Sequence, residues 1–449
     1  MSSSEETGKS RRSDLSFLLT KGGLAFLLRG LTMAGQYLLI FTLARMYGPA
    51  TMGNFTLALT VLQLFAILAQ AGLDNRLTRV VAASGNPINL NRIRTAYSQS
   101  LLLTFLISTL VAVMLYLLSG WIATTWFHKP QLEQSLQYIA IALVPFVLIG
   151  INGAAFRGLK NMTGFLLFRG LIPFLTVIPL YIAGVNGSIT PVAAYSFATL
   201  LLCGASFVTW YRYSAIQTGN YQEPEPVKFI LSDALPMMLT GSVFFLLNWT
   251  DNLLLGIFRS ETEVGLYDTA FKIASASAIV LMGLNAIQGP VFAELYHKKD
   301  IAALNKQVKQ STKISFFITL PFTVIVCVLN AEILQLFGTE FMLAGTALVL
   351  LAIGNFISSI SGSVGILLQM TGHQKAYNKI ITSTAIGSIL LNIILIPRFG
   401  ITGAAIASGS AKIIQNIASV IYTYRTTGLF TLYLPGIDKL FPFKQSSQG

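Results

Sequence analysis

Residues 95–119 read TAYSQSLLLTFLISTLVAVMLYLLS, a run without a single charged side chain. A helix needs about 20 apolar residues to cross the roughly 30 Å hydrocarbon core of a bilayer, so this run predicts one membrane span. Similar stretches follow along nearly the whole chain of 449 residues, of which 54% are hydrophobic and only 10% charged. An ordinary soluble domain carries roughly 25% charged residues, so the composition excludes a soluble globular protein.

The same length criterion predicts twelve helices, six on each side of a polar connection rich in Pro and Glu. The expected spans are 15–44, 52–72, 95–119, 135–157, 163–183, 190–212, 229–257, 264–293, 312–329, 343–369, 377–397 and 401–424. The resulting domains are a disordered cytoplasmic tail (1–14), an N-terminal six-helix bundle (15–212), a cytoplasmic linker (213–228), a C-terminal six-helix bundle (229–424) and a cytoplasmic tail (425–449).

The positive charges predict the orientation of these helices. With the N-terminus in the cytoplasm, 21 of the 30 Lys and Arg residues fall in inside segments and four in outside segments. Basic residues concentrate in cytoplasmic loops of membrane proteins, so the bias supports twelve spans with both termini inside. We therefore expect a multi-pass protein of the cytoplasmic (inner) membrane. The formal charge of +13 then needs no nucleic-acid partner.

The two halves look like copies displaced by 212 residues. Gly53-Asn54-Phe55 falls on Gly265-Leu266-Tyr267, and residues 189–193 (ITPVA) fall on residues 401–405 (ITGAA). An even number of helices in each copy makes the repeats parallel, related by an axis along the membrane normal. The sequence therefore predicts an all-α polytopic membrane protein, with two parallel six-helix repeats around a central cavity suited to alternating access.

Signatures of enzymatic chemistry are missing from the sequence. It contains no GxxxxGK[ST] phosphate loop, and its three histidines are isolated in expected loops without metal-ligand spacing. Both cysteines lie in apolar runs, which indicates neither a disulfide framework nor a zinc site. We expect a secondary transporter rather than an enzyme, with no cofactor and no metal.

Three basic residues within the expected helices are candidates for substrate binding. Arg29 lies about 14 residues into its span, about 21 Å of helical rise, which is too deep to reach either surface easily. Lys272 has Asp268 four residues earlier on the same face, so a local salt bridge is an alternative. Lys412 stands among small residues (GAAIASGSAKII), where a close helix contact is the alternative. For Arg29 the alternative is an ion pair with another helix or a hydrogen bond to a backbone carbonyl in an unwound segment.

The remaining intramembrane charges suggest gating or ion coupling. Asp251, in the run NWTDNLLLG, could face the cavity or cap an external helix end. Asp233 is the repeat mate of Lys21, and the two could pair as part of a cytoplasmic gate. Five basic residues against three acidic ones make the helix interior cationic. A cationic lumen attracts an anionic solute, and arginine binds two phosphate oxygens at once through its planar fork.

Three segments resemble the polysaccharide-exporter branch of the multidrug/oligosaccharidyl-lipid/polysaccharide (MOP) flippase superfamily. They are LARMYGP (43–49) with GNF (53–55) and AGL (71–73); TDNLLLG (250–256) with VGLY (264–267) and Ala270; and LIPRFGITGAAIA (395–407). Spread over both halves, they cover the whole membrane region.

The resemblance implies a Wzx-type flippase with a MATE/MOP-like fold. Two bundles would enclose a V-shaped cationic cavity, and a polyprenyl-pyrophosphate-linked oligosaccharide would cross it for synthesis of O-antigen, lipopolysaccharide or exopolysaccharide. The similar lipid II flippases have basic residues in their first and eighth helices, the helices that hold Arg29 and Lys272 here. Those flippases have fourteen helices, so twelve favour the O-antigen or exopolysaccharide branch.

Two other functions stay open. A cation-coupled exporter of small organic molecules on the same fold would use unpaired Asp251 or Asp233. A membrane scaffold for a polysaccharide synthase would have a solidly packed interior with paired charges. Beside the lipid bilayer and the lipid-linked glycan, a polysaccharide polymerase or glycosyltransferases are the expected partners.

Overall fold

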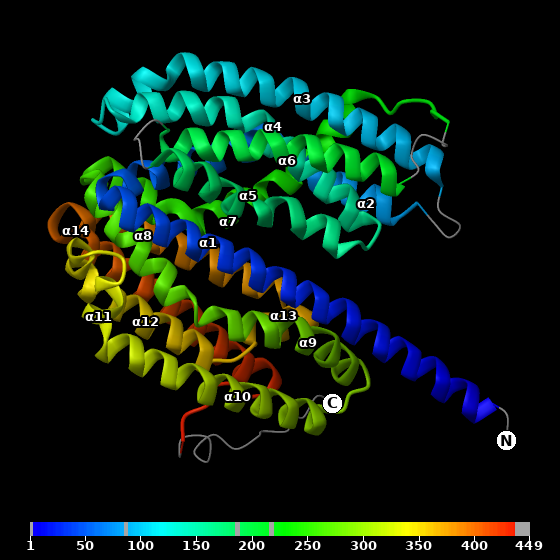
Figure 1. Cartoon of the computed structure of the whole chain (residues 1–449). Coiled ribbons are helices and arrows are strands. Elements are labelled where there is room, and N and C mark those ends of the chain that lie inside the picture. The colour runs from blue at the N-terminus through cyan, green and yellow to red at the C-terminus, as the bar shows by residue number, and fades with distance from the viewer. Residues whose placement is uncertain (1–2, 85–88, 185–188, 215–219, 436–449) are drawn as a thin grey trace. The chain divides into compact units, whose positions relative to one another are not determined.

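The computed structural model describes residues 3–84, 89–184, 189–214 and 220–435, with side chains from residue 27 onward except at 183–184, 240, 243–244, 247 and 286. Every regular element in this part of the chain is a helix (Figure 1). The elements are α1 (Ser3–Gln70), α2 (Leu73–Ala82), α3 (Leu90–Trp121), the π-helical turn η1 (Ile122–Trp126), α4 (Leu132–Gly158), α5 (Met162–Gly184), α6 (Pro191–Ser214), α7 (Val227–Phe258), α8 (Glu261–Ser275), α9 (Ala278–His297), α10 (Ile301–Val328), α11 (Asn330–Gln335), the 3-10 turn η3 (Thr339–Ala344), α12 (Gly345–Ile360), α13 (Val364–Met370) and α14 (Gln374–Thr427).

These helices account for all twelve predicted spans. Eight helices among the described residues are long and apolar enough to cross a membrane, and α8 with α9 forms a ninth, bent by 47°. Two of the eight, α1 and α14, each contain two predicted spans, and α7 covers the predicted range 229–257. The chain is therefore an all-α polytopic membrane protein. The backbone of α1 begins at Ser3, ahead of the predicted start at residue 15.

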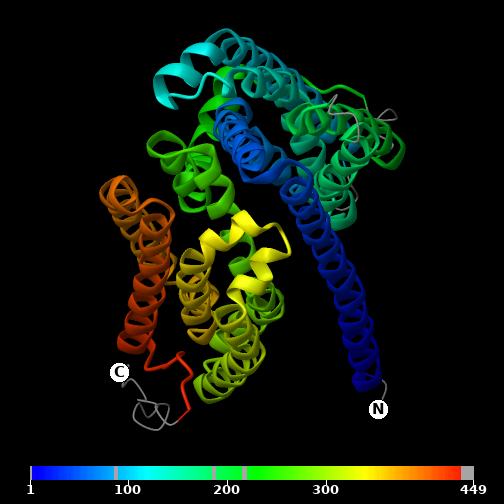
Figure 2. The same ribbon diagram turned by 60° about the vertical axis from the view of Figure 1, so that its left-hand side comes forward.

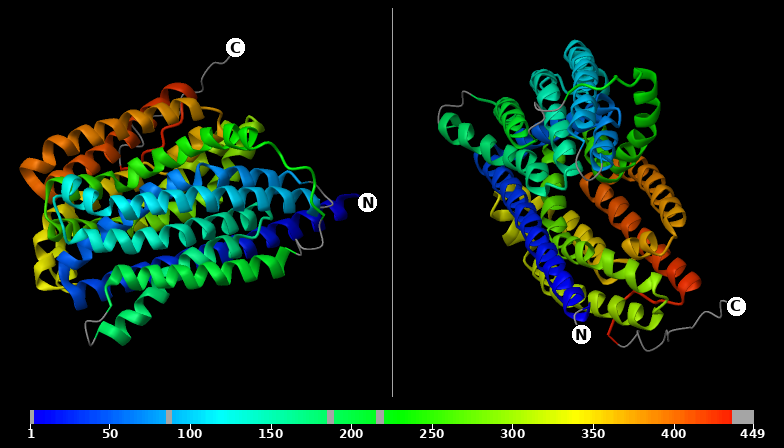
Figure 3. Two further views of the ribbon diagram at one scale, coloured as in Figure 1. Left: turned by 90° about the horizontal axis from the view of Figure 1, so that it is seen from above. Right: turned by 90° about the vertical axis from the view of Figure 1, so that its right-hand side faces the viewer.

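Glycines with left-handed backbone angles separate the two limbs of α1 and of α14. Gly48 has φ 74° and Gly400 has φ 55°, a region that is costly for residues with a Cβ atom. The neighbouring Pro49 and Pro397 reinforce the interruption, because proline lacks the N–H of a regular helical turn. The limbs of α14, orange and red in Figure 3, run alongside each other, as expected for two successive spans.

Two of the predicted spans are interrupted, which the hydropathy does not reveal. The predicted helix 343–369 divides into η3, α12 and α13, with a break at residues 361–363 where Gly362 has φ 68°. The carbonyl of Ile360, released from the helical ladder by this break, accepts a hydrogen bond of 3.0 Å from the backbone N–H of Tyr433. The predicted helix 264–293 bends between Ser275 and Ala278. An unbroken apolar run therefore conceals both interruptions.

The chain forms two compact units, which are described separately. Unit 1 comprises Met1–Tyr47 and Asn54–Leu246, and unit 2 comprises Gly48–Gly53 and Leu247–Gly449. The units divide within α7, while the predicted boundaries of the two repeats stay a prediction. In unit 1, α4 packs against α2, α3, α5 and α6, and α3, α4 and α6 run side by side (Figures 1 and 3).

A buried hydrogen-bond network fixes α4 at the centre of unit 1. The hydroxyl of Tyr97 on α3 donates to Asn152 Oδ1 on α4 at 2.6 Å, and Asn152 Nδ2 donates to the hydroxyl of Ser206 on α6 at 2.8 Å. Asn152 is completely buried. Buried polar side chains that are hydrogen-bonded specify one packing arrangement, because any other would leave them without partners.

In unit 2, α12 occupies the corresponding central position and packs against α8, α10 and α14; α10 and α12 lie side by side in Figure 2. The start of α8 follows from its sequence, because Ser260 and Glu263 form a capping box in which each side chain binds the other's backbone N–H. Leu367 of α13 and Leu429 beyond α14 pack with residues of α9 and α10 in a buried apolar cluster. The polar interior of unit 2 lies between these elements.

Candidate functional site in the second unit

Asp251 is the acceptor in a cluster of neutral hydrogen-bond donors. Its carboxylate accepts from the hydroxyl of Tyr267 on α8 at 2.8 Å, from Asn392 Nδ2 at 2.7 Å and from the hydroxyl of Ser408. Asn392 and Ser408 lie at equal sequence distances before and after Gly400, so the turn at Gly400 brings both limbs of α14 to the same carboxylate. A charge at membrane depth is tolerated when such groups replace its hydration shell.

Lys412 lies one helical turn after Ser408 on α14. Its ammonium donates to Asn355 Oδ1 of α12 at 2.6 Å. Close packing surrounds this pair, because a Cβ atom on Gly354 would lie 3.0 Å from the Cα of Gly409. Lys412 therefore stands beside a tight contact between helices, and it also lines a pocket.

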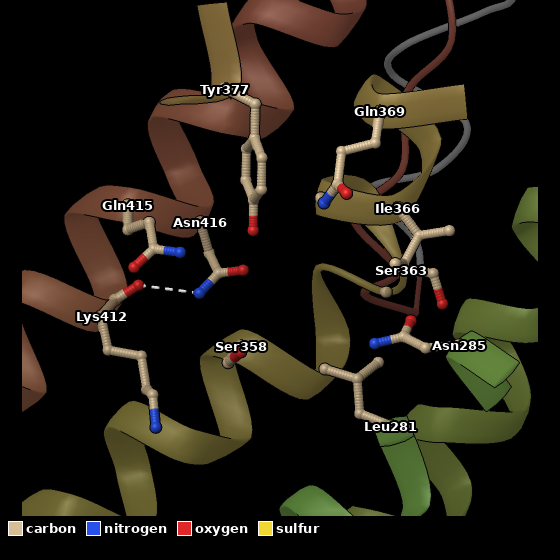
Figure 4. A pocket seen from close by; sticks show the side chains of 12 residues that line it. Leu281, Asn285, Ser358, Ser363, Ile366, Gln369, Tyr377, Lys412, Gln415 and Asn416 are labelled. Carbon is tan, nitrogen blue, oxygen red and sulfur yellow. Dashed lines mark hydrogen bonds between the residues drawn. The ribbon is translucent and has the colours of Figure 1, made fainter. Parts of the chain in front are cut away.

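The pocket lies next to Lys412 and is bounded by α9, α12, α13 and α14 (Figure 4). Its volume is about 150 Å³. In Figure 4 the side-chain ends of Gln369, Tyr377 and Asn416 point toward a space that the amide of Asn285 faces from the opposite side. The break at Gly362 forms part of the wall, so the interrupted tenth span contributes directly to the site.

Lys272 and Asp268 form the local salt bridge that their spacing allows. The Nζ–Oδ2 distance is 2.7 Å, with Asp268 buried and Lys272 30% exposed. Asn252 Nδ2 on α7 also approaches Asp268 Oδ1 at 3.4 Å. Lys272 therefore has an anionic neighbour within the protein and still retains access to its surroundings.

The other predicted site residues lie in unit 1. Arg29 is exposed, and within the described residues it forms no ion pair. Asp233 on α7 binds two arginines of α2, with Arg76 Nε at 3.2 Å and Arg79 also paired to it. The side chain of Lys21 lies outside the described residues, so the expected pairing of Lys21 with Asp233 stays a prediction.

Arg76 lies on α2, between the spans predicted at 52–72 and 95–119. It is 2% exposed and pairs with Glu225 as well as with Asp233. Charge alone does not identify the neutral partners Asn355, Asn392 and Ser408. Asn and Gln residues inside apolar spans indicate such partners in the sequence, because an amide at membrane depth needs a hydrogen-bond partner.

Among the described residues, no group of three or more His, Cys, Asp or Glu side chains is placed to hold a metal ion. Amides and hydroxyls provide the hydrogen bonds to Asp251 and Lys412.

Comparison with known proteins relates the chain to transporters. Residues 18–297 match the family described as "Polysaccharide biosynthesis protein", and residues 236–397 match the family MatE. A relative from Haloferax volcanii, "Probable low-salt glycan biosynthesis flippase Agl15", is 26% identical over 220 residues. That match spans 45% of this chain and 45% of the relative, or about half of its length.

Solved structures share the fold at low sequence identity. An inward-facing multidrug resistance MATE family transporter of the MOP superfamily superposes with a TM-score of 0.71 at 16% identity, covering 89% of this chain and 95% of the other. The lipid II flippase MurJ, in an inward closed conformation, gives a TM-score of 0.70 at 16% identity, covering 90% and 87%. Similarity at this level concerns the fold alone.

Proposed function

Because the chain belongs to the polysaccharide biosynthesis protein family of the MOP superfamily, we propose that it is a flippase for a lipid-linked glycan. Its substrate is a polyprenyl-pyrophosphate-linked oligosaccharide used for O-antigen or exopolysaccharide, and it crosses the cytoplasmic membrane by alternating access. The protein acts as a secondary transporter and performs no covalent chemistry. Both termini lie in the cytoplasm, where a polymerase or glycosyltransferases are its expected partners.

Arg29 is the observation that carries this proposal. Its side chain is exposed on α1, and it lies near the centre of the span predicted at residues 15–44. Exposure to lipid at the bilayer centre costs about 2.5–3.5 kcal/mol on insertion scales, so Arg29 is better placed facing an aqueous path. A guanidinium there binds pyrophosphate or an acidic sugar in bidentate fashion. Within unit 2, Lys272 and Lys412 are proposed to supply positive charge for the same substrate.

Asp251 is proposed as the ion-coupling residue. A carboxylate surrounded by neutral donors can exchange a proton or a small cation without losing an ion-pair partner, because the nearest contacts carry no charge of their own. Asp233, with its two arginines, and Lys21 are proposed to act in cytoplasmic gating. In this scheme the binding of an ion to Asp251 biases the orientation of the empty carrier.

The second candidate function is a cation-coupled exporter of small organic molecules. The match of residues 236–397 to the MatE family and the three hydrogen bonds to Asp251 favour it, because a coupled antiporter needs a titratable acid in its interior. The two functions differ in substrate and can share the coupling step.

Export of polysaccharide in a flippase-deleted host tests the proposal. The variants Arg29→Ala and Lys272→Ala, at normal protein level in the membrane, are expected to abolish export, and Arg29→Lys and Lys272→Arg are expected to restore most of it. Full export with both alanine variants would remove these residues from the mechanism. Resistance of the same host to cationic dyes, gained without any export, would favour the second function.

A further inference from the structure

The pocket beside Lys412 is lined by groups that both donate and accept hydrogen bonds. Asn285, Gln369 and Asn416 carry amides, and Tyr377 carries a hydroxyl. A sugar hydroxyl likewise donates one hydrogen bond and accepts others, so amides and hydroxyls complement a ring of hydroxyl groups better than charges do. The polar ends of these four residues converge in Figure 4.

Two oxygens in the wall of the pocket have no partner within the described part of the chain. These are Asn285 Oδ1 and Ser363 Oγ, both buried as atoms, and the Ser363 residue is only 6% exposed. Buried polar atoms are nearly always hydrogen-bonded, so each one indicates a missing donor. Asn416 already uses its Nδ2 to bind the carbonyl of Lys412 at 2.8 Å, which leaves its Oδ1 available to the pocket.

The volume limits what the pocket can hold. The pocket has a volume of about 150 Å³. Pockets for drug-sized ligands measure about 300–1,000 Å³, so this pocket is smaller than the site that a whole oligosaccharide would fill. One sugar ring, replacing a few waters with its own hydroxyls, has the right scale and the right chemistry.

The distribution of charge argues against pyrophosphate as the occupant. Lys412 is the one charged residue among the described residues that line the pocket. Its ammonium is bound to Asn355 Oδ1 and lies apart from the converging amides in Figure 4. Recognition of a multiply charged phosphate group relies on several cations or on bidentate arginine, which this wall does not provide.

We propose that this pocket is a binding subsite for one uncharged sugar ring, recognised through its hydroxyl or acetamido groups. The subsite rests on the proposed flippase function in so far as the ring belongs to the transported glycan. Gly365 lets the Tyr377 hydroxyl reach the pocket wall, because a Cβ atom on Gly365 would lie 2.3 Å from that hydroxyl oxygen.

Direct binding tests the subsite without any transport. The full chain in lipid nanodiscs is titrated with the methyl glycosides of glucose, galactose, mannose, N-acetylglucosamine and N-acetylgalactosamine, and separately with inorganic pyrophosphate. At least one glycoside is expected to bind, and Asn285→Leu and Gln369→Leu are each expected to weaken it at least tenfold. Gln335→Leu, an exposed glutamine on α11, is the matched control and should bind like the parent.

Three results would overturn the subsite: no glycoside binds, the leucine variants bind as the parent does, or pyrophosphate displaces the bound glycoside. Asn285→Leu removes an unsatisfied buried oxygen and should fold. If either Asn285→Leu or Gln369→Leu fails to fold, glycoside binding is still measured with the other variant. Failure of the subsite differs from failure of the flippase. Export that persists unchanged in both leucine variants rejects the subsite alone, whereas glycoside binding without any export rejects the flippase alone.

Discussion

Gly53 and Gly265, which are repeat mates at the 212-residue displacement, face each other with their backbones in direct contact. A Cβ atom on Gly53 would lie 1.7 Å from the carbonyl oxygen of Glu261, and one on Gly265 would lie 2.1 Å from the carbonyl oxygen of Pro49. Pro49 and Glu261 are themselves mates at the same displacement. The contact of Pro49 and Gly53 with the start of α8 is therefore two-fold in character.

Replacing Gly265 should therefore loosen unit 2. Gly265→Val inserts three carbons against the Pro49 carbonyl, and overpacking of this kind typically costs about 1–3 kcal/mol. The destabilisation is measured as a fall in the thermal unfolding midpoint of the purified protein. Gly387→Ala is the control, because a Cβ atom at Gly387 meets nothing within 4 Å. An equal fall in both variants would contradict the assigned contact.

Asp251 should tolerate asparagine better than leucine. Asp251→Leu leaves Tyr267, Asn392 and Ser408 without their acceptor, at about 1–3 kcal/mol for each buried donor. Asp251→Asn keeps one acceptor oxygen and most of the packing, so it should remain folded but lose ion-dependent transport.

Thermal unfolding and transport across an imposed proton or sodium gradient separate these two effects. Glu332→Gln, at an exposed position on α11, controls for loss of a carboxylate in general. Undiminished gradient dependence in Asp251→Asn would exclude Asp251 from coupling.

Lys412 and Asn355 should be energetically coupled. Directly hydrogen-bonded residues show interaction free energies of about 0.5–3 kcal/mol in double-mutant cycles. We expect Lys412→Met and Asn355→Leu to destabilise the protein individually, and the double variant to lose less than their sum. Additive losses would mean that the 2.6 Å contact contributes nothing to stability.

Arg76 should contribute far more to stability than Arg79, although both bind Asp233. Arg76 is 2% exposed and Arg79 is 53% exposed. Breaking a buried pair costs about 3–5 kcal/mol; because Asp233 and Glu225 are partly exposed, we expect about 1–3 kcal/mol for Arg76→Ala. An exposed pair is worth about 0–1 kcal/mol, which sets the expectation for Arg79→Ala. Chemical denaturation of the two variants in parallel measures their free energies of unfolding. Equal losses of stability in Arg76→Ala and Arg79→Ala would contradict the prediction.

The local arrangement of the candidate site was only partly predictable. The spacing of Asp268 and Lys272 places them on one helical face, so their salt bridge follows from helix geometry. No such rule links Asp251 to Asn392 and Ser408, which are more than a hundred residues away and meet it only through the turn at Gly400. Asp233 shows the same limit, because repeat symmetry suggested Lys21, whereas its described partners Arg76 and Arg79 come from α2.

The sequence by itself determined the membrane class and the all-α fold, whereas the repeat of the two halves stays a prediction. Class and fold depend on the hydrophobicity and the length of single segments, and a bilayer converts such local properties directly into helices. Tertiary structure alone decided where the tenth span breaks, which neutral amides surround the intramembrane charges, and that a polar pocket lies between α9, α12, α13 and α14. Those features depend on which helix faces meet, and a polar residue facing a pocket has the same one-dimensional signature as one that is paired with its neighbour.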